Sequence, residues 1–269
     1  MNSNNSPKYQ QWQIPNYTTV ELSERQSKYC ICIFVINEGE KIRKQLQNMQ
    51  AISQDIDVII ADGGSTDGSL EVDFLKNVSV RALLTKQSKG KLSAQMRMAF
   101  AYAMLQYEGV ITIDGNNKDD PTAIYSFIQA LDRGCDHIQG SRFIKGGKAI
   151  NTPWNRYLAI RLIHAPLISI SAGFRYTDTT NGFRAYSWRL LLDPRLAPFR
   201  NTFSGYELHY YLAIRAVQLG YLVRELPVTR RYPNKGPIPT KISPIKGNIL
   251  VIQTLLKACL HQFDPPNFE

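Results

Sequence analysis

The 269-residue chain lacks any apolar run that could span a membrane, because a spanning helix needs about 20 consecutive apolar residues and no stretch approaches that length. Its first residues, MNSNNSPKYQQWQ, lack the apolar core of a secretory signal, so we expect no export. Cysteine is scarce. The four cysteines show neither the CxxC nor the Cys/His spacing of a zinc site. These absences predict a cytoplasmic protein with reduced thiols.

Acidic residues are scarce in the second half of the chain. Residues 1–141 carry 14 Lys or Arg and 16 Asp or Glu, whereas residues 142–269 carry 18 and 6. A half this basic indicates a polyanionic partner, such as nucleic acid, anionic lipid or a phosphorylated substrate, although a solvated basic face is the plainer interpretation. No recognised nucleic-acid-binding motif accompanies the charge, so we expect no nucleic-acid partner.

Apolar runs alternate with amphipathic stretches from residue 29 onward. We predict strands at 29–36, 56–61, 78–84, 109–113 and 135–139, with helices at 38–49, 92–106 and 122–133. This alternation is typical of βαβ units and predicts an α/β fold with a mostly parallel, Rossmann-type sheet and helices on both faces.

The second half continues with longer elements. We predict an amphipathic helix at 157–173 interrupted by Pro166, a helix at 206–220, a strand at 221–231, a loop at 232–239 and a last amphipathic helix at 243–261. We therefore divide the chain into three parts. These are a polar arm lying over the surface (1–28), a central domain (29–242) and a C-terminal amphipathic helix with its tail (243–269).

Polar residues follow three of the predicted strands, as Asn37-Glu38, Asp62-Gly63-Gly64 and Asp114-Gly115-Asn116. In open parallel sheets the ligand crevice lies beyond the carboxyl ends of the strands. The segment DGGSTDGS, residues 62–69, has neither the Lys-Ser/Thr ending of a P-loop nor the spacing of a dinucleotide fingerprint. Asp62 could accept hydrogen bonds from a base or ribose, and an ordinary strand–turn–helix junction explains the segment equally well.

Asp114 stands at a strand end with the polar Asn116 two residues later. Such a pair can hold a divalent ion that bridges two phosphates. Asp119 and Asp120 come directly before Pro121, a residue that suits the first turn of a helix. We therefore predict that Asp119 and Asp120 cap a helix, and that Asp114 serves the chemistry.

Five motifs in order resemble the family-2 glycosyltransferases, nucleotide-sugar enzymes of the GT-A fold, and within them the dolichyl- and polyprenyl-phosphate mannose synthases. The motifs are Asn37-Glu38, the glycine-rich segment 62–68, Asp114-Gly-Asn116, Gly140-Ser-Arg142-Phe with Gly146-Gly147, and the segment 177–184 (TDTTNGFR). Tyr206-Glu207 and the basic stretch from Arg230 to Lys241 fit as well. The resemblance runs from about residue 29 to about residue 243.

The resemblance implies a role for each matching residue. Donor binding falls to Asn37, Glu38, Asp62, Gly64, Asp114, Gly115 and Lys118, with Lys235 and Lys241 on a loop that closes over the donor. Asp114 and Asn116 would hold Mg²⁺ or Mn²⁺. Arg142 and Arg184 would contact phosphate oxygens, for which a planar guanidinium is well shaped.

Three positions depart from the family pattern. Asn116 replaces the usual second acid of the metal motif, Gly63 replaces the second Asp of the glycine-rich segment, and Phe34 and Ile36 replace a Pro and a Tyr. The neutral Asn116 is a weaker metal ligand than a carboxylate. We therefore take as a hypothesis that Lys118 supplies part of the positive charge at the diphosphate.

The kind of acceptor determines whether the reaction needs a general base. A hydroxyl acceptor needs a general base, whereas a phosphate is already anionic. Glu207 is the candidate base, although its place at a helix start also suits pairing with an arginine. We expect inverting transfer of a hexose from a GDP- or UDP-sugar to a polyprenyl phosphate. The alternatives are transfer to a saccharide hydroxyl with Glu207 as base, and a non-catalytic nucleotide-sugar-binding module.

The two predicted amphipathic helices suggest how the protein could reach an acceptor in a membrane. A lipid-linked acceptor would suit helices 157–173 and 243–261 resting in the headgroup layer of a membrane, helped by Lys and Arg. Packing against the core is the alternative for both helices. The oligomeric state does not follow from the sequence.

Overall fold

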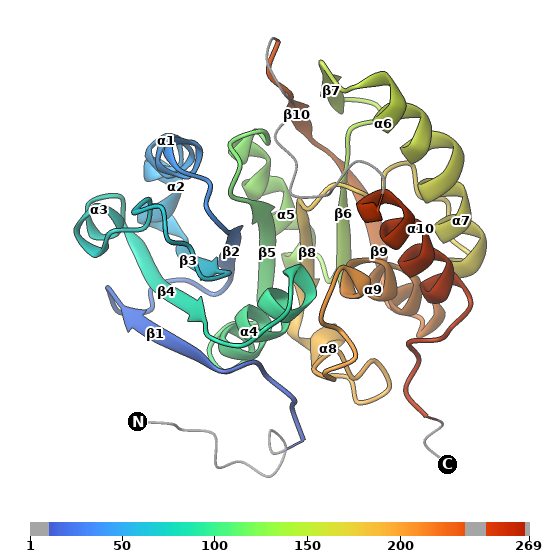
Figure 1. Cartoon of the computed structure of the whole chain (residues 1–269), viewed down its shortest axis with the longest axis horizontal. Coiled ribbons are helices and arrows are strands. Elements are labelled where there is room, and N and C mark those ends of the chain that lie inside the picture. Colours follow the sequence, from blue (N-terminus) through green and yellow to red (C-terminus); the bar gives the residue numbers. More distant parts are fainter. Residues whose placement is uncertain (1–10, 235–245, 267–269) are drawn as a thin grey trace.

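The computed structural model describes residues 11–234 and 246–266, and a twisted sheet runs through the centre of the molecule (Figure 1). Its strands are β1 (Tyr17–Glu21), β2 (Cys30–Val35), β3 (Asp57–Asp62), β4 (Val80–Lys86), β5 (Gly109–Asp114), β6 (His137–Ser141), β8 (Arg184–Ser187) and β9 (Val223–Pro227). Within the described residues they lie in the order β1-β4-β3-β2-β5-β8-β6-β9. Strands β4, β3, β2 and β5 are mutually parallel, as are β6 and β9, whereas β1 and β8 run antiparallel to their neighbours.

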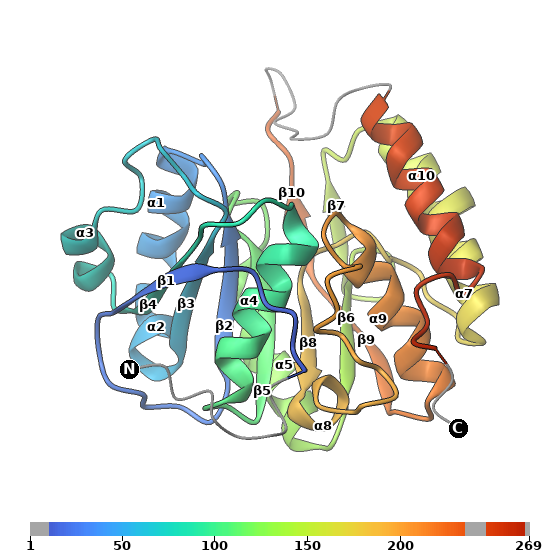
Figure 2. The same ribbon diagram turned by 60° about the horizontal axis from the view of Figure 1, so that its bottom comes forward.

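Helices cover both faces of this sheet, as Figure 2 shows. One core holds α1 (Glu40–Asn48), α2 (Gln50–Asp55), α3 (Val72–Asn77) and α5 (Ile124–Asp132). The other holds α4 (Leu92–Met104), α7 (Ala165–Ala172), α8 (Trp188–Leu191), α9 (Glu207–Gln218) and α10 (Lys246–Cys259). Alternate residues of β2 point into the two cores, so a strand buried on both faces is apolar throughout. The predicted mostly parallel sheet with helices on both faces is confirmed.

Two strands of the main sheet were not predicted. Part of the segment expected to be a surface arm forms β1, which pairs with β4 from Tyr17 opposite Lys86 to Glu21 opposite Ala82. The other is β8, a four-residue strand inserted between β5 and β6. Neither has a distinctive apolar pattern, because β1 is largely exposed at the sheet edge and β8 is too short to show a period.

The strand expected at 221–231 is divided at Val228. Its first part is β9, and its second part is β10 (Thr229–Arg231), which leaves the main sheet and pairs in parallel with β7 (Lys148–Ile150). At the two ends of β10, the backbone of Arg231 donates to Lys118 O at 2.7 Å and that of Asp120 donates to Thr229 O at 3.0 Å. This departure carries β10 against the segment that follows β5.

The helix expected at 157–173 is not broken at Pro166. Helix α6 (Trp154–Ala159), the π-helical segment η3 (Ile160–His164) and α7 follow one another, and their junction residues Ile160 and Ala165 keep right-handed helical angles. A π-helical turn just before a proline accommodates the residue that cannot donate a backbone hydrogen bond. Segments α6, η3 and α7 therefore form one continuous helix.

Helix α10 lies against α7 and α9. Its buried residues Thr254, Leu255 and Ala258 face these neighbours, whereas Ile249, Leu256 and Leu260, which directly follows the helix, are exposed. In the parts of the chain that the structure describes, no helix is long and apolar enough to cross a membrane.

Candidate active site

Asp62 and Asp114 lie at the same edge of the sheet, on either side of the end of β2. In the strand register Val35 is paired with Asp62 of β3, and Phe34 is paired with Asp114 of β5. Neighbouring strands are about 4.8 Å apart, so the two aspartates are separated by about 10 Å, two strand spacings. Parallel pairing therefore brings together two acids that are 52 positions apart in the sequence.

The loops that follow β2 and β3 are joined to each other. The backbone N–H of Asn37 donates to Ser65 Oγ at 2.9 Å, and Asn37 Oδ1 accepts from the backbone of Thr66 at 2.8 Å. The backbone of Gly39 donates to Asp67 Oδ2 at 2.8 Å. Asn37 has a positive φ of 46°, which its short polar side chain tolerates. These bonds hold a preformed surface beside the end of β2.

The carboxylate of Asp62 closes its own turn. It accepts from the backbone of Ser65 at 2.9 Å and from Ser65 Oγ at 2.6 Å, and Asp62 is only 3% exposed. Gly64, with φ of 98°, supplies the left-handed backbone that the turn requires. Glu38 pairs with Lys41 at 3.4 Å. Contacts of Asp62, Glu38 and Gly64 with a nucleoside stay predictions.

A buried arginine from β10 joins two acids beside the end of β5. Arg230 Nη2 lies 3.0 Å from Asp114 Oδ2, and Arg230 Nη1 pairs with Asp119 Oδ2. The side chain of Asp119 is fully buried, and burial raises its pKa to about 6 although Arg230 opposes the shift. The prediction that Asp119 caps a helix is therefore wrong, because long-range pairing takes this carboxylate inward. Asp120 is the cap, accepting from the backbone of Thr122 at 3.0 Å.

The chain offers two oxygen ligands for a divalent ion at this place, the Asp114 carboxylate and Asn116 Oδ1. The Asn116 oxygen is buried and has no hydrogen-bond partner among the described residues, and oxygen is the ligand that Mg²⁺ and Mn²⁺ prefer. Within residues 11–234 and 246–266, no cluster of three or more His, Cys, Asp or Glu could hold a metal ion. The pair fits an ion whose remaining ligands come from a diphosphate and water.

Gly115 and Gly182 leave room for this arrangement. A Cβ on Gly182 would lie 2.4 Å from Asp114 Oδ1, and one on Gly115 would lie 2.8 Å from Val35 Cγ2. Real Cβ contacts are not that short, so any other residue at 182 would push the Asp114 carboxylate aside. Gly182 thus sets the position of Asp114, while Gly115 keeps the end of β5 close to β2.

Arg142 is bound to an acid of its own. Its Nε lies 2.6 Å from Asp178 Oδ2 and its Nη2 lies 2.9 Å from Asp178 Oδ1, with both side chains almost fully buried. Burial would raise the pKa of Asp178, but the guanidinium of Arg142 holds it below its usual value. Arg142 Nη2 also donates to Thr180 Oγ1 at 2.9 Å. This forked pair fixes the loop 177–182, and contact of Arg142 with a phosphate stays a prediction.

Arg184 lies beneath the same loop and is 1% exposed. Its guanidinium donates to the backbone oxygens of Thr179 at 2.7 Å, Asn181 at 3.0 Å and His209 at 2.7 Å. These bonds tie the loop to α9. Contact of Arg184 with a phosphate also stays a prediction, and it would require this buried side chain to change partners.

Three cations surround Tyr232 next to Asp114. Lys118 Nζ lies 5.0 Å from the centre of the Tyr232 ring, and the guanidinium carbons of Arg156 and Arg230 lie 5.7 and 5.8 Å from it. Burial and the charge of Arg230 lower the pKa of Lys118. We call Lys118, Arg156 and Arg230 the cationic cluster. It gives the edge of the site beside β5 a concentrated positive charge.

Glu207 stands at the start of α9, where its carboxylate accepts from the backbone of Gly205 at 2.7 Å. This contact favours the structural alternative for Glu207, with a backbone amide rather than an arginine as the bonded group. Lys235 and Lys241 lie outside the described residues.

Comparison with known proteins now bears on this arrangement. The model of the family described as glycosyl transferase family 2 matches residues 30–193, more than half of the chain. The chain belongs to glycosyl transferase family 2. This glycosyltransferase thus carries Asp62 and Asp114 inside the family segment, whereas Arg230 and Tyr232 lie beyond it.

Two characterised relatives support the predicted resemblance. The glycosyltransferase is 25% identical over 203 residues to a polyprenol monophosphomannose synthase of Mycolicibacterium smegmatis, an alignment that covers 74% of this chain and 76% of the relative. It is 26% identical over 197 residues to an undecaprenyl-phosphate mannosyltransferase of Micrococcus luteus, covering 72% and 79%. The predicted similarity to this branch is confirmed.

A solved structure supports the fold. Glucosyl-3-phosphoglycerate synthase from Mycobacterium tuberculosis, in complex with Mn²⁺, uridine diphosphate and phosphoglyceric acid, superposes with a TM-score of 0.64 at 14% identity. The superposition covers 90% of this chain and 80% of that one. The GT-A-type fold predicted for the glycosyltransferase is confirmed.

The site of the glycosyltransferase contains residues to which no role was assigned from the sequence, chiefly Asp178, Arg230, Arg156 and Tyr232, although Asp178 lies in the motif 177–184 and Arg230 begins the basic stretch. One signal was present. With 6 acids against 18 basic residues after position 141, each acid of the second half has many possible partners. Because a buried carboxylate needs a partner, Asp178 inside a mostly apolar fold could have been assigned to an arginine.

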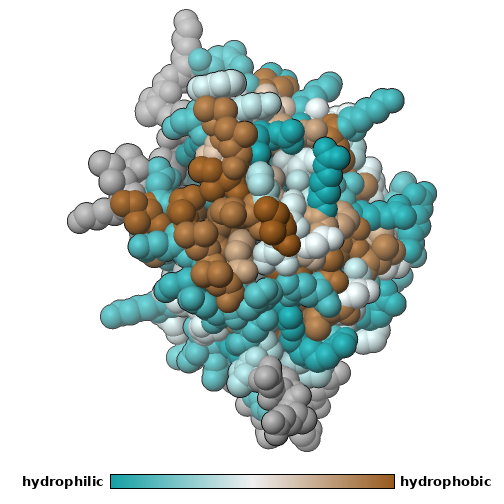
Figure 3. All heavy atoms as spheres, turned by 90° about the vertical axis from the view of Figure 1, so that its right-hand side faces the viewer, coloured by the Kyte–Doolittle hydropathy of each residue, from teal (hydrophilic) through white to brown (hydrophobic). Residues whose placement is uncertain are grey.

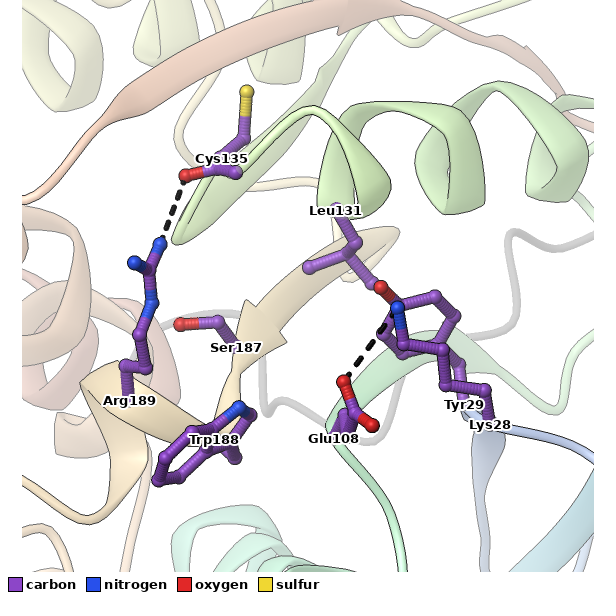
Figure 4. Close-up of a pocket in the computed structure, with 9 residues that line it drawn as sticks. Lys28, Tyr29, Glu108, Leu131, Cys135, Ser187, Trp188 and Arg189 are labelled. Carbon is purple, nitrogen blue, oxygen red and sulfur yellow. Dashed lines mark hydrogen bonds and ion pairs between the residues drawn. The ribbon is translucent and has the colours of Figure 1, made fainter.

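A pocket lies at the opposite edge of the sheet from Asp62 and Asp114 (Figure 4). This pocket, of about 260 Å³, is lined by Lys28, Tyr29 and Glu108 at the amino ends of β2 and β5, and by Trp188 and Arg189 at the start of α8. Its cations are already neutralised, since Lys28 lies 3.5 Å from Glu108 and Arg189 lies 3.0 Å from Asp136. None of the predicted site residues lines it.

Proposed function

We propose that the protein transfers a hexose from a GDP- or UDP-sugar to a polyprenyl phosphate, with inversion by direct displacement at the anomeric carbon. The observation that carries the proposal is the meeting, at one sheet edge, of Asp114 with the cationic cluster. Both the departing nucleoside diphosphate and an attacking phosphate are anions, and fixed cations stabilise such charge most in a water-poor site.

On the donor side, the joined loops after β2 and β3 would receive the nucleoside, with Asn37, Glu38 and Asp62 nearest to it. The diphosphate would then lie toward Asp114, where Asn116 and Gly115 leave space. A divalent ion held by Asp114 and Asn116 would supply positive charge to the departing diphosphate. Lys118, close to the same place, adds a charge that belongs to the chain itself.

On the acceptor side, the structure supports a phosphate better than a hydroxyl. A phosphate nucleophile needs no general base, and the carboxylate of Glu207 is engaged at the start of α9. Arg156 of α6 contacts the hydroxyl of Tyr232 at 3.5 Å. The cationic cluster therefore extends from the end of β5 to helix α6. The names of the two relatives agree with this acceptor, since one is a polyprenol monophosphomannose synthase and the other an undecaprenyl-phosphate mannosyltransferase.

Apolar side chains gather on the side of the molecule where α7 and α10 lie, as Figure 3 shows. We define the apolar side face as the exposed residues Trp154, Leu162, Ile163, Ile170, Ile249, Leu256 and Leu260. Ile170 is 81% exposed and Trp154 is 70% exposed, which is unusual for side chains of this size. Exposed apolar patches of this kind mark interaction sites.

We propose that a bilayer with anionic headgroups covers the apolar side face. Ile249 and Leu256 are spaced by seven residues and share one side of α10, and Leu260 follows directly after the helix, while Leu255 and Ala258 pack on the other side. Arg161 and Lys257 are exposed on the same helices and would meet anionic headgroups. Arg156 links α6 to Tyr232, so the face begins next to the site where a lipid phosphate would arrive.

The test of the reaction is a transfer assay with labelled GDP- and UDP-hexoses and a polyprenyl phosphate in detergent. Asp114→Asn should lower kcat/KM by on the order of 10²–10³. Asp120→Asn is the matched control, since Asp120 only caps the neighbouring turn, and it should keep nearly full activity. Glu207→Gln should also keep activity. Transfer to a saccharide but not to the lipid phosphate, abolished by Glu207→Gln, would refute the proposed acceptor.

The test of the membrane face is co-sedimentation with vesicles of phosphatidylcholine, with and without phosphatidylglycerol. The protein should bind the anionic vesicles, and Ile170→Glu with Leu260→Glu should abolish binding while detergent-based activity persists. Leu105→Glu is the control, because Leu105 is exposed at the end of α4 and outside the face. Loss of a dimer in the double variant, with vesicle binding absent throughout, would show a second copy as the occupant instead.

A further inference from the structure

Arg230 pairs with both Asp114 and Asp119, although its contacts with the two acids differ in surroundings. Asp119 is fully buried, whereas the side chain of Asp114 is 29% exposed. The main chain reinforces the inner contact, since Asp119 and Arg230 also form an antiparallel bridge. Arg230 is thus held firmly at Asp119 and meets Asp114 at the open side of the site.

The contact with Asp114 falls on the oxygen that faces Asn116. Asp114 Oδ2 lies 3.0 Å from Arg230 Nη2 and 3.4 Å from Asn116 Nδ2, while Asp114 Oδ1 is turned toward Gly182. A divalent ion shared by Asp114 and Asn116 would need this same oxygen together with Asn116 Oδ1, which has no hydrogen-bond partner in the described parts of the chain. The guanidinium and the ion therefore compete for one carboxylate oxygen.

Charge balance points the same way. Asp114 and Asp119 carry two negative charges, and Arg230 and Lys118 carry two positive charges close to them. Arg156, the third member of the cationic cluster, adds a further positive charge, so three positive charges stand against two negative ones and a divalent ion arriving alone enters a site with no net attraction for it. A nucleoside diphosphate brings the negative charge that would be needed to hold the ion and both side chains at once.

We infer that Arg230 competes with the metal ion for Asp114. Arg230 stays paired with Asp114 until the ion and the diphosphate arrive together. It then leaves Asp114, remains held by Asp119, and turns the released N–H groups to the diphosphate. The inference rests on the proposed function for the identity of the diphosphate ligand. In this role Arg230 is a positioning residue, since it controls when Asp114 is available. It would prevent the ion from occupying the site without a donor.

The experiment measures Mn²⁺ binding to the full chain by electron paramagnetic resonance, first without nucleotide and then with UDP or GDP. Wild type should bind Mn²⁺ weakly alone and more tightly with nucleotide. Arg230→Gln should bind Mn²⁺ alone about tenfold or more tightly than wild type, and it should gain less from nucleotide. Arg231→Gln is the matched control, because Arg231 is the exposed neighbour with the same charge, and it should behave as wild type.

Arg230→Lys separates direct competition from overall charge, and it carries the test if Arg230→Gln fails to fold, as judged by its thermal melting. A lysine keeps the charge but cannot span both acids as a planar fork does, so Mn²⁺ alone should again bind more tightly than to wild type. If a folded Arg230 variant binds Mn²⁺ no more tightly than Arg231→Gln, the inference is overturned. Because the readout uses neither sugar nor lipid, it stands apart from a failure of the transfer assay.

Discussion

The two sides of the site are built from different interactions. The loops after β2 and β3 are joined by hydrogen bonds between backbone amides and short polar side chains of residues 28 or 29 positions apart. The side contributed by the second half is joined by buried ion pairs that connect residues 36, 111 and 116 positions apart. The first kind of contact is open to replacement by water, whereas the second leaves a buried charge when one partner is lost. The two sides should therefore respond to mutation by different amounts.

The largest effect is expected for the buried pair of Arg142 and Asp178. Arg142→Met would leave the Asp178 carboxylate uncompensated, so the free energy of unfolding should fall by about 3–5 kcal/mol in urea titrations. Arg195→Met is the matched control, because the Arg195 side chain is 60% exposed where it meets Asp193, and it should cost about 0–1 kcal/mol. Equal losses of unfolding free energy in Arg142→Met and Arg195→Met would contradict the proposed difference between the two sides of the site.

The next effect concerns the close approach of Gly182 to Asp114. Gly182→Ala should lower the free energy of unfolding by about 1–3 kcal/mol through overpacking, and it should weaken nucleotide and Mn²⁺ binding in calorimetry because Asp114 must move. Gly134→Ala is the control. Gly134 has a φ of 84° far from Asp114, so that variant should lose stability without losing affinity. Unchanged affinity in Gly182→Ala would show that Asp114 tolerates displacement.

A third effect is a pH dependence that comes from a buried histidine at the start of β6. His137 is completely buried, its ring nitrogens have no hydrogen-bond partner in the described parts of the chain, and burial followed by the charge of Arg184 lowers its pKa to about 3. The folded pKa lies below the unfolded value of about 6.5, so the stability that neutral His137 allows is present above pH 6.5. It is lost as pH falls toward 3, by about 1.4 kcal/mol per pH unit.

His137→Phe should therefore reduce the pH dependence of the unfolding free energy between pH 6.5 and 4, measured by urea titration at several pH values, while His209, whose pKa burial also lowers, keeps the rest of the slope. Tyr186→Phe serves as control. It alters the ring that stacks on His137 at 5.1 Å but removes no group that titrates in this range, so it should keep the wild-type slope. A wild-type slope in His137→Phe would mean that this histidine is not the group responsible.

The smallest effect is expected where the loops after β2 and β3 meet. Ser65→Ala removes the hydroxyl that donates to Asp62 and accepts from Asn37, so unfolding should become easier by only about 0.5–1.5 kcal/mol. If this surface receives the nucleoside, KM for the donor should rise more than kcat falls in steady-state kinetics. Ser126→Ala, an exposed position on α5, is the control. A loss as large as that of Arg142→Met would contradict the comparison.

The same division explains which parts of the molecule could be predicted. Strands β2, β3 and β5 and helices α1, α4 and α9 lie close to the predicted ranges, because each is long enough for its apolar period to be visible. The placement of Asp62 and Asp114 at one edge followed from parallel strand order alone. Strand β8 was missed, since its four residues are buried by pairing with β5 and β6 rather than by a pattern of their own.

The partners of the charged residues were much harder to predict. Asp119 and Asp120 are neighbours before a proline and look equivalent in the sequence, yet one caps a turn and the other is buried against Arg230. Local spacing can predict a helix cap, because the capping side chain and the backbone N–H group that donates to it lie within a few residues of each other. The ion pair of Asp119 and Arg230 joins residues 111 positions apart, and it forms only because β10 leaves the main sheet at Val228. No local sequence pattern predicts where the chain leaves the sheet.

What the amino-acid sequence determined by itself was the order of the main strands and helices, the edge at which Asp62 and Asp114 meet, and the family, because hydrophobic period and short motifs are local properties. Only the tertiary structure decided which cation meets which acid: Arg142 with Asp178, and Arg230 with Asp114 and Asp119. The physical reason is that Coulomb attraction has no sequence period. Each arginine of a basic half could satisfy any nearby carboxylate, and the fold chooses the pair by bringing two particular side chains together out of water.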